Sequence, residues 1–249
     1  METALKRIAS RLLAKTPEVY LTMLKALRRG SVEKRLYLSV VRRGDIVIDA
    51  GANVGYFTML FADLVGRHGE VHAFEPVPGT FQLLSENIRR FPSYKNVRLN
   101  CAALGDRDHR TDILVPQGDY GQAALVRHKD GSWRDAEIVS TNIEMLRLDQ
   151  YAQHLVKIDF VKCDVEGAEL LMLRGGESTL RRCRPKIYLE IEERWTSSFG
   201  WNVSDVFRFL RDVGYTHFYG VESSGMKIEE VGYTNGGILC SWKEVSGLA

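Results

Sequence analysis

The sequence lacks two features that would place a chain in or across a membrane. Its 249 residues contain no run of about 18 apolar residues, the length that a membrane-spanning helix needs. The first residues, METALKRIAS, also lack the continuous apolar stretch and small-residue cleavage site of a signal peptide. We therefore expect a cytoplasmic protein without a transmembrane helix.

Cysteine is scarce, and the few cysteines are scattered. The chain has four, Cys101, Cys163, Cys183 and Cys240, with no Cys-x-x-Cys pair and no Cys/His cluster. This spacing argues against a zinc site and against a disulfide framework. Reduced and mostly buried thiols are predicted instead.

The chain has almost no net charge, but the formal value of +2 conceals an uneven distribution. Residues 1–43 hold 11 lysines and arginines and 3 acidic residues. The rest of the chain holds 23 lysines and arginines and 29 acidic residues. Within 1–43, Leu5, Ile8, Leu12 and Leu13 fall on one stripe of a basic amphipathic helix. This segment could dock on an anionic membrane surface, or it could pack its apolar stripe on its own domain.

An apolar content of 45% is sufficient for a hydrophobic core. After residue 43, short β-branched runs alternate with helical stretches, a pattern typical of a doubly wound, mostly parallel α/β sheet. The main predicted strands are at 45–49, 70–75, 97–102, 158–163 and 186–191, with helices at 56–65, 80–90 and 203–213. Strands near 216–219 and 237–242 are joined without a helix, which predicts an antiparallel hairpin.

Residues 107–147 interrupt this alternation. Three short strands are predicted there, at 111–115, 123–126 and 137–143, with glycine-containing turns between them. We interpret this stretch as a β-rich insertion. The predicted organisation is thus an N-terminal helical cap at 1–43 and one domain at 44–249 that carries the insertion.

A strand, a glycine turn and a helix follow one another in Val47-Ile-Asp-Ala-Gly-Ala-Asn-Val-Gly55. In a doubly wound sheet such a turn faces the crevice where ligands bind, and glycine lets a ligand lie against the backbone. The spacing fits neither the G-x-G-x-x-G fingerprint of dinucleotide sites nor a P-loop. Asp49, two positions before Gly51, would repel a phosphate but favour a cationic ligand.

Further candidate residues lie where the second and third predicted strands end. Glu75 is placed to accept hydrogen bonds from a ribose diol, by the geometry known from dinucleotide folds. The small residues Ala102 and Ala103 would let a flat ring approach the backbone, although small residues at a strand end are also common without any ligand.

Carboxylates gather after the fourth and fifth predicted strands. Asp164 ends the fourth strand and Glu166 and Glu169 follow, where acidic side chains could also simply favour the dipole of the next helix. Glu190 belongs to the fifth strand, and it would meet Asp164 if the two strands are neighbours. Facing carboxylates can act as a general base, hold a divalent cation or bind substrate hydroxyls.

Together these motifs resemble the class I S-adenosylmethionine-dependent methyltransferases, and within them the FkbM family. The strings that carry the resemblance are IDAGANVGYFT (48–58), AFEPVPGTF (73–81), CAALGD (101–106), RLDQY (147–151) and VKCDVEGAELLMLRGG (161–176). The resemblance implies a seven-stranded sheet whose final strand is antiparallel, with S-adenosylmethionine as the methyl donor. It assigns Asp49, Gly51, Asn53 and Gly55 to the methionine end, Glu75 to the ribose, and Ala102 and Ala103 or Asp106 to the adenine.

Relatives in this family commonly methylate hydroxyl groups of sugars, glycolipids or polyketide-type natural products, which predicts an O-methyltransferase. Asp164 is the first candidate for the base, followed by Glu190 and then Glu166, and Asp164 with Glu190 could hold Mg²⁺. The acidic body after residue 43 argues against a nucleic-acid acceptor. A methyltransferase for another nucleophile, and a catalytically silent S-adenosylmethionine-binding protein, are the alternatives. The sequence sets neither the acceptor nor the oligomeric state.

Overall fold

The computed structural model describes residues 32–117, 122–128, 133, 136–221 and 235–246. The basic amphipathic helix predicted near the N-terminus lies outside these residues. No helix within the described ranges is both long enough and apolar enough to cross a membrane.

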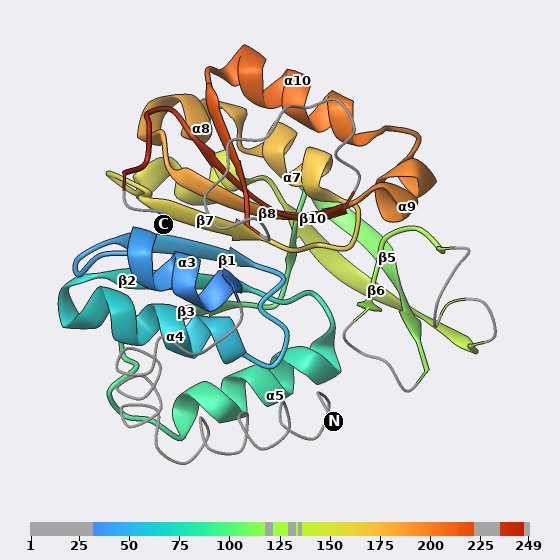
Figure 1. The fold of residues 1–249 in the computed structure, drawn as a ribbon. Helices are drawn as coiled ribbons and strands as arrows, with labels where there is room; N and C mark the ends of the chain where they lie inside the picture. Colours follow the sequence, from blue (N-terminus) through green and yellow to red (C-terminus); the bar gives the residue numbers. More distant parts are fainter. Residues whose placement is uncertain (1–31, 118–121, 129–132, 134–135, 222–234, 247–249) are drawn as a thin grey trace.

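A seven-stranded sheet forms the centre of the molecule, in the order β3-β2-β1-β7-β8-β10-β9 (Figure 1). Its strands are β1 (Ile46–Ala50), β2 (Glu70–Phe74), β3 (Val97–Asn100), β7 (Phe160–Cys163), β8 (Lys186–Glu192), β9 (His217–Gly220) and β10 (Asn235–Ser241). Neighbours are parallel except that β10 is antiparallel to both β8 and β9. The predicted doubly wound sheet with an antiparallel last strand is confirmed. Its order reverses between β1 and β7, where the crevice of such a sheet opens.

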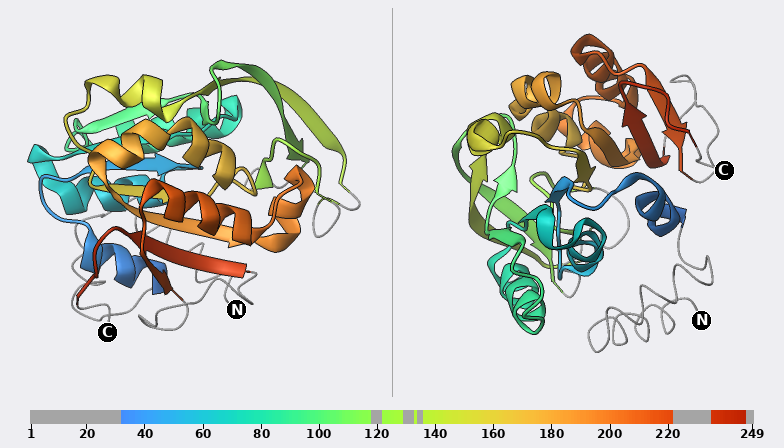
Figure 2. Two further views of the ribbon diagram at one scale, coloured as in Figure 1. Left: turned by 90° about the horizontal axis from the view of Figure 1, so that it is seen from above. Right: turned by 90° about the vertical axis from the view of Figure 1, so that its left-hand side faces the viewer.

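Helices cover both faces of this sheet and bury a separate apolar cluster on each (Figures 1 and 2). One face carries α3 (Val32–Val40), α4 (Tyr56–Val65) and α5 (Pro78–Arg89). The other carries α6 (Leu148–Tyr151), α7 (Glu169–Gly175), α8 (Glu177–Cys183) and α10 (Val203–Val213), while the short α9 (Glu193–Thr196) follows β8 directly. Single 3-10 turns lie at Gly66–His68, Ala152–His154 and Ser197–Phe199.

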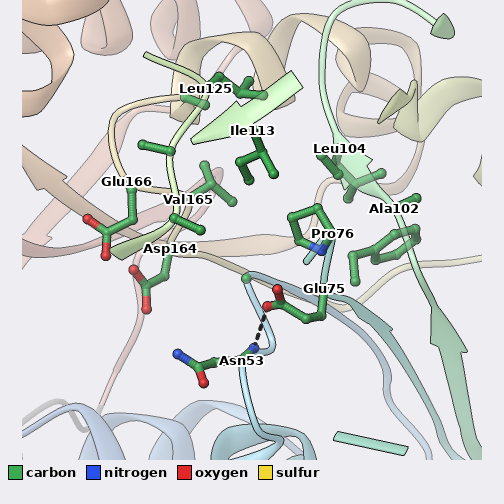
Figure 3. Close-up of a pocket in the computed structure, with 16 residues that line it drawn as sticks. Asn53, Glu75, Pro76, Ala102, Leu104, Ile113, Leu125, Asp164, Val165 and Glu166 are labelled. Carbon is green, nitrogen blue, oxygen red and sulfur yellow. Dashed lines mark hydrogen bonds between the residues drawn. The ribbon is translucent and has the colours of Figure 1, made fainter. Parts of the chain in front are cut away.

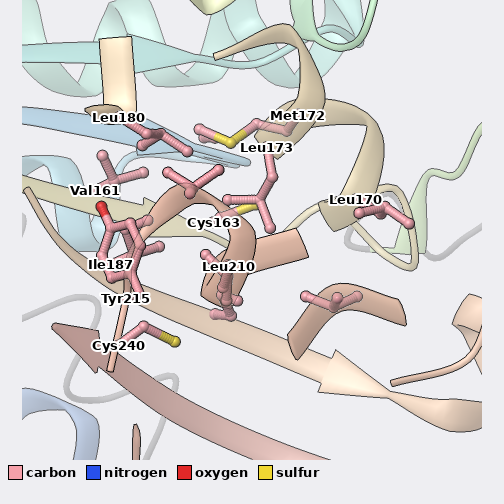
Figure 4. Close-up of a cluster of buried hydrophobic side chains, with 14 of the residues drawn as sticks. Val161, Cys163, Leu170, Met172, Leu173, Leu180, Ile187, Leu210, Tyr215 and Cys240 are labelled. Atoms are coloured by element: carbon pink, nitrogen blue, oxygen red, sulfur yellow. The ribbon is translucent and has the colours of Figure 1, made fainter. Parts of the chain in front are cut away.

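Helix α10 shows how sequence periodicity builds these layers. Its buried residues, Val203, Val206, Phe207, Leu210 and Val213, recur at the spacing of one helix face and pack on the cluster drawn in Figure 4. The side chain of the residue before the helix accepts a hydrogen bond from the backbone of the third helical residue, which returns one in a capping box. Each fully buried side chain of this type stabilises the fold by about 1.5–3 kcal/mol.

A second, three-stranded sheet has the order β4-β6-β5. It contains β4 (Ala103–Leu104), β5 (His109–Pro116) and β6 (Ile138–Leu146), and the β5–β6 hairpin projects from the main sheet (Figures 1 and 2). The strand predicted at 123–126 is wrong, because Ala124 makes only an isolated bridge to Leu114 and the chain bends directly afterwards. The strand predicted at 97–102 ends at residue 100, since the next residues cross over to pair with β6.

Candidate active site

The turn after β1 brings the chain unusually close to the end of β7. Gly51 has a φ of 78°, and a Cβ there would lie 1.9 Å from the backbone oxygen of Asp164. The backbone N–H groups of Gly51 and Ala52 both donate to Phe74 O, at 3.1 and 2.9 Å, so the turn is also fastened to β2. Glycine is therefore required at this position by the packing of three strand ends, independently of any ligand.

A pocket opens at these strand ends (Figure 3). Seven of the residues predicted from the sequence line it: Gly51, Asn53, Glu75, Ala102, Ala103, Asp164 and Glu166. The segment predicted as an insertion supplies further apolar walls: Ile113, Ala123, Ala124 and Leu125. The structure thus brings together side chains that are more than 100 residues apart in the sequence.

Four predicted residues are not among those that line the pocket. Asp49 is completely buried, where it accepts a 2.6 Å hydrogen bond from the Thr58 hydroxyl. Gly55 is the N-cap of α4 and faces α5, Asp106 forms an ion pair with its neighbour Arg107, and Glu190 is half-buried on β8. Any effect of Asp49 on a ligand in this pocket would have to pass through the side chains around it.

Glu75 is held in one orientation at the pocket wall. Its Oε2 accepts a hydrogen bond from Asn53 N at 2.9 Å, and its Oε1 accepts one from Val77 N at 3.0 Å (Figure 3). Burial raises the pKa of the Glu75 carboxyl to about 7. Each carboxylate oxygen can accept a second hydrogen bond, so the group retains the capacity to bind a diol.

Asp164 and Glu190 lie side by side near the carboxyl ends of the inner strands β7 and β8. β7 and β8 are parallel, with Cys163 opposite Leu189. The residues that follow these two in the sequence, Asp164 and Glu190, are therefore neighbours, as predicted. Burial, and then the charge of Asp164, raises the pKa of Glu190 to about 8. The expected convergence of these two carboxyl groups is present in the structure.

Glu166 also lines the pocket, and its backbone is strained. Its φ is 54°, in the left-handed region, and its Oε2 is buried without a hydrogen-bond partner among the described residues. Burial, followed by the charges of Asp164 and Glu190, raises its pKa to about 9. A pKa in this range favours the protonated form near neutral pH, in which the carboxyl group has an O–H donor.

Lys162, which was not predicted as a site residue, is the only cation paired with these carboxyl groups among the described residues. Its ammonium group lies 3.1 Å from Asp164 Oδ2 and 3.7 Å from Asp49 Oδ1, and the residue is 1% exposed. A signal was available. Lys162 is a charged residue in an otherwise apolar strand, two positions before Asp164 and therefore on the same face.

A sequence model of the FkbM methyltransferase domain matches residues 49–216, the region that builds this site. The chain belongs to the FkbM methyltransferase family. The predicted family membership is confirmed.

Named relatives of this FkbM domain include methyltransferases from several organisms. The 31-O-demethyl-FK506 methyltransferase FkbM of Streptomyces tacrolimicus is 52% identical over 163 residues, which cover 55% of this chain and 61% of that protein. The 2-O-methyltransferase NoeI of Sinorhizobium fredii is 27% identical over 64% of this chain and 69% of its own length. The hexuronic acid methyltransferase AglP of Haloferax volcanii is 28% identical over 59% of this chain and 56% of its own length. The chain spans about three fifths of the length of these relatives.

Solved structures share the fold of this FkbM domain at low sequence identity. The methyltransferase FkbM of Methylobacillus flagellatus superimposes with a TM-score of 0.51 and 14% identity, covering 83% of this chain and 50% of that one. An S-adenosylmethionine-dependent O-methyltransferase of Thermotoga maritima gives a TM-score of 0.51 at 14% identity, covering 88% of this chain and 69% of that one.

The residues of the pocket fit the methyl donor of the FkbM family. A fixed carboxylate at Glu75 suits a ribose, alanines and aliphatic side chains suit a flat ring, and the buried free oxygen of Glu166 lacks a partner that a ligand could supply. The predicted Mg²⁺ has no corresponding support in the structure. No group of three or more histidine, cysteine, aspartate or glutamate side chains within the described ranges is arranged to hold a metal ion.

Proposed function

We propose that this FkbM-family chain is an S-adenosylmethionine-dependent O-methyltransferase whose acceptor is a hydroxyl of a sugar, a glycolipid or a related natural product. The observation that carries the proposal is the pairing of a pocket that fits the donor with carboxyl groups at its rim, Asp164 and Glu166. Relatives named for O-methylation and for a hexuronic acid support the acceptor class.

The chain's own residues would act mainly by positioning. Bound S-adenosylmethionine supplies a methyl group already activated by its positive sulfur. The pocket would hold the acceptor oxygen in line with that methyl carbon, and such orientation can lower a barrier by up to roughly 7–11 kcal/mol. Asp164 would accept the hydroxyl proton as the new O–C bond forms, while protonated Glu166 would donate a hydrogen bond to another acceptor oxygen.

Mg²⁺ bound by Asp164 and Glu190 is the alternative way to activate the hydroxyl. The ammonium group of Lys162 already lies against Asp164 and competes for its oxygens. We therefore favour activation by the carboxylate alone. Contact of the basic segment 1–43 with a membrane, and the division of the chain at residue 43, stay predictions.

The direct test is transfer of label from S-adenosylmethionine to a panel containing 31-O-demethyl-FK506, a free hexuronic acid and a glycolipid, with and without Mg²⁺. Asp164→Asn should lower kcat by about 100-fold or more, the range typical of a general base. Asp212→Asn, on the exposed side of α10, is the matched control and should leave kcat unchanged. Binding of S-adenosylmethionine without turnover on any acceptor would instead favour a catalytically silent protein.

A further inference from the structure

Lys162 carries a charge at the centre of the sheet, where charge is costly. It lies within β7 between two completely buried residues, Val161 and Cys163, and its side chain is 2% exposed. Removing an ammonium ion from water is unfavourable unless its surroundings compensate for the lost hydration. The contacts of Lys162 should therefore indicate why this side chain is present.

Those contacts connect three parts of the site. The ammonium group donates to Asp164 Oδ2 at 3.1 Å and to the carbonyl oxygen of Gly51 at 3.4 Å, and it lies 3.7 Å from Asp49 Oδ1. Its open side faces the ring of Phe57 at 5.4 Å from the centroid. One side chain thus joins the buried end of β1, the turn beside the pocket and the tip of β7.

Among the charged side chains of this group, Asp164 is the one that lines the pocket. Its side chain is 28% exposed, whereas those of Asp49 and Lys162 are almost fully enclosed. We propose that Lys162 is a positioning residue for methyl transfer, which holds the Asp164 carboxylate at a fixed distance from the cofactor-binding turn. The inference rests on the proposed function. Misplacement of a reacting group by about 1 Å can cost about 100-fold in rate, so the tether should matter for kcat.

Lys162 also sets the charge balance of the carboxyl groups around it. Its positive charge lowers the pKa of Asp49, Glu75 and Glu190, in opposition to the burial that raises all three. The titratable groups around Lys162 and these carboxyl groups are Asp49, Glu75, Cys163, Asp164, Glu166, Glu169, Tyr188, Glu190 and Glu192, with Glu33 and Tyr37 from α3. Without Lys162, the pKa values of Asp49, Glu75 and Glu190 should rise further.

The test is a double-mutant cycle between Lys162→Met and Asp164→Asn. Methyl transfer is measured with labelled S-adenosylmethionine and the panel acceptor of highest turnover, and S-adenosylhomocysteine binding is measured by calorimetry. Lys162→Met should lower kcat by about 100-fold, move the acidic limb of the pH profile to higher pH, and change S-adenosylhomocysteine affinity less than about threefold. In the Asp164→Asn background it should cause little further loss of kcat. If the two substitutions lower kcat independently, so that the double variant shows the product of the two single losses, the inference is overturned.

A further variant separates positioning from charge balance within the core. Asp49→Asn/Lys162→Met removes both buried charges, so it should fold even where Lys162→Met alone melts at lower temperature. If Lys162 positions Asp164, the double variant should have a much lower kcat than Asp49→Asn alone. Recovery to the rate of Asp49→Asn would show that Lys162 only neutralises Asp49. If the unaltered protein methylates no panel acceptor, the proposed function fails. If it is active and Lys162→Met is equally active, only the inference about Lys162 fails.

Discussion

Replacing Gly51 with alanine should test whether the close contact between the β1 turn and β7 supports the site. A Cβ at this position would lie 1.9 Å from Asp164 O and 3.0 Å from its carbonyl carbon. An ordinary contact would require the two segments to separate by about 1 Å or more. The same shift would stretch the hydrogen bond from Asp164 N to Ala50 O, which is 3.2 Å long.

The expected size of the effect has two parts. A left-handed backbone costs an L-residue roughly 1–2 kcal/mol, and overpacking a tight contact costs about 1–3 kcal/mol more. Gly44 offers a matched control, because it has a φ of 85° but nothing within 4 Å of the position of a Cβ. Gly44→Ala should therefore show the backbone cost alone, and Gly51→Ala should be less stable than Gly44→Ala by about 1–3 kcal/mol.

Urea-induced unfolding followed by circular dichroism gives the free energy of unfolding of both variants, and calorimetry gives their affinity for S-adenosylhomocysteine. Gly51→Ala should bind at least about tenfold more weakly than the unaltered protein, a loss of about 1.4 kcal/mol, because the turn moves away from the pocket. Gly44→Ala should bind normally. Equal stability of the two alanine variants, with normal binding by both, would refute the steric argument.

Three further predictions concern the same site. Glu75→Gln should weaken S-adenosylhomocysteine binding about tenfold by calorimetry, because an amide cannot accept from both Asn53 N and Val77 N and would leave a buried donor unsatisfied. The melting temperature should fall between pH 6 and pH 8.5. The folded state keeps a proton on Glu166 up to about pH 9 that the unfolded chain releases near pH 4.5, so stability declines across that window, and Glu166→Gln should reduce the decline. Methyl transfer should survive exhaustive EDTA treatment, since Lys162 already neutralises charge at the rim, and complete loss restored by Mg²⁺ would contradict this.

Local sequence signals were sufficient for most helices. The helix predicted at 56–65 is found with the same bounds, because an apolar stretch is enclosed by Gly55 and Gly66, which both have a positive φ. The helix predicted at 203–213 also matches, since its periodicity and its capping residues agree with one another. In both segments the determinants lie within a few residues of the element itself.

Strand predictions failed where pairing depends on distant residues. The stretch 97–102 has continuous strand character, but register with β6 takes Ala103 and Leu104 into the second sheet. Residues 123–126 do lie beside β5, yet only Ala124 pairs with it, through two backbone hydrogen bonds exchanged with Leu114. Strand propensity reflects the fit to neighbouring strands, and those neighbours cannot be identified from a short window.

The site was predictable to the extent that strand ends could be located. Glu75, Asp164 and Glu190 each lie at or beside the carboxyl end of a correctly predicted strand, so their convergence followed from the topology. Burial was harder to foresee. Asp49 is the one polar residue in the apolar strand β1, and only the helices packed on the sheet decide that its side chain is enclosed.

The buried lysine connects the charge pattern of the sequence to the proposed chemistry. Asp49 and Asp164 share the single positive charge of Lys162, and raised pKa values keep Glu166 and Glu190 mainly protonated near neutral pH. Lys162 and the raised pKa values therefore lower the negative charge beside the pocket below that of four ionised carboxyl groups. Such a balance suits a donor with a single positive sulfur, because a stronger negative field would stabilise the cation in the ground state and oppose the loss of its charge during transfer.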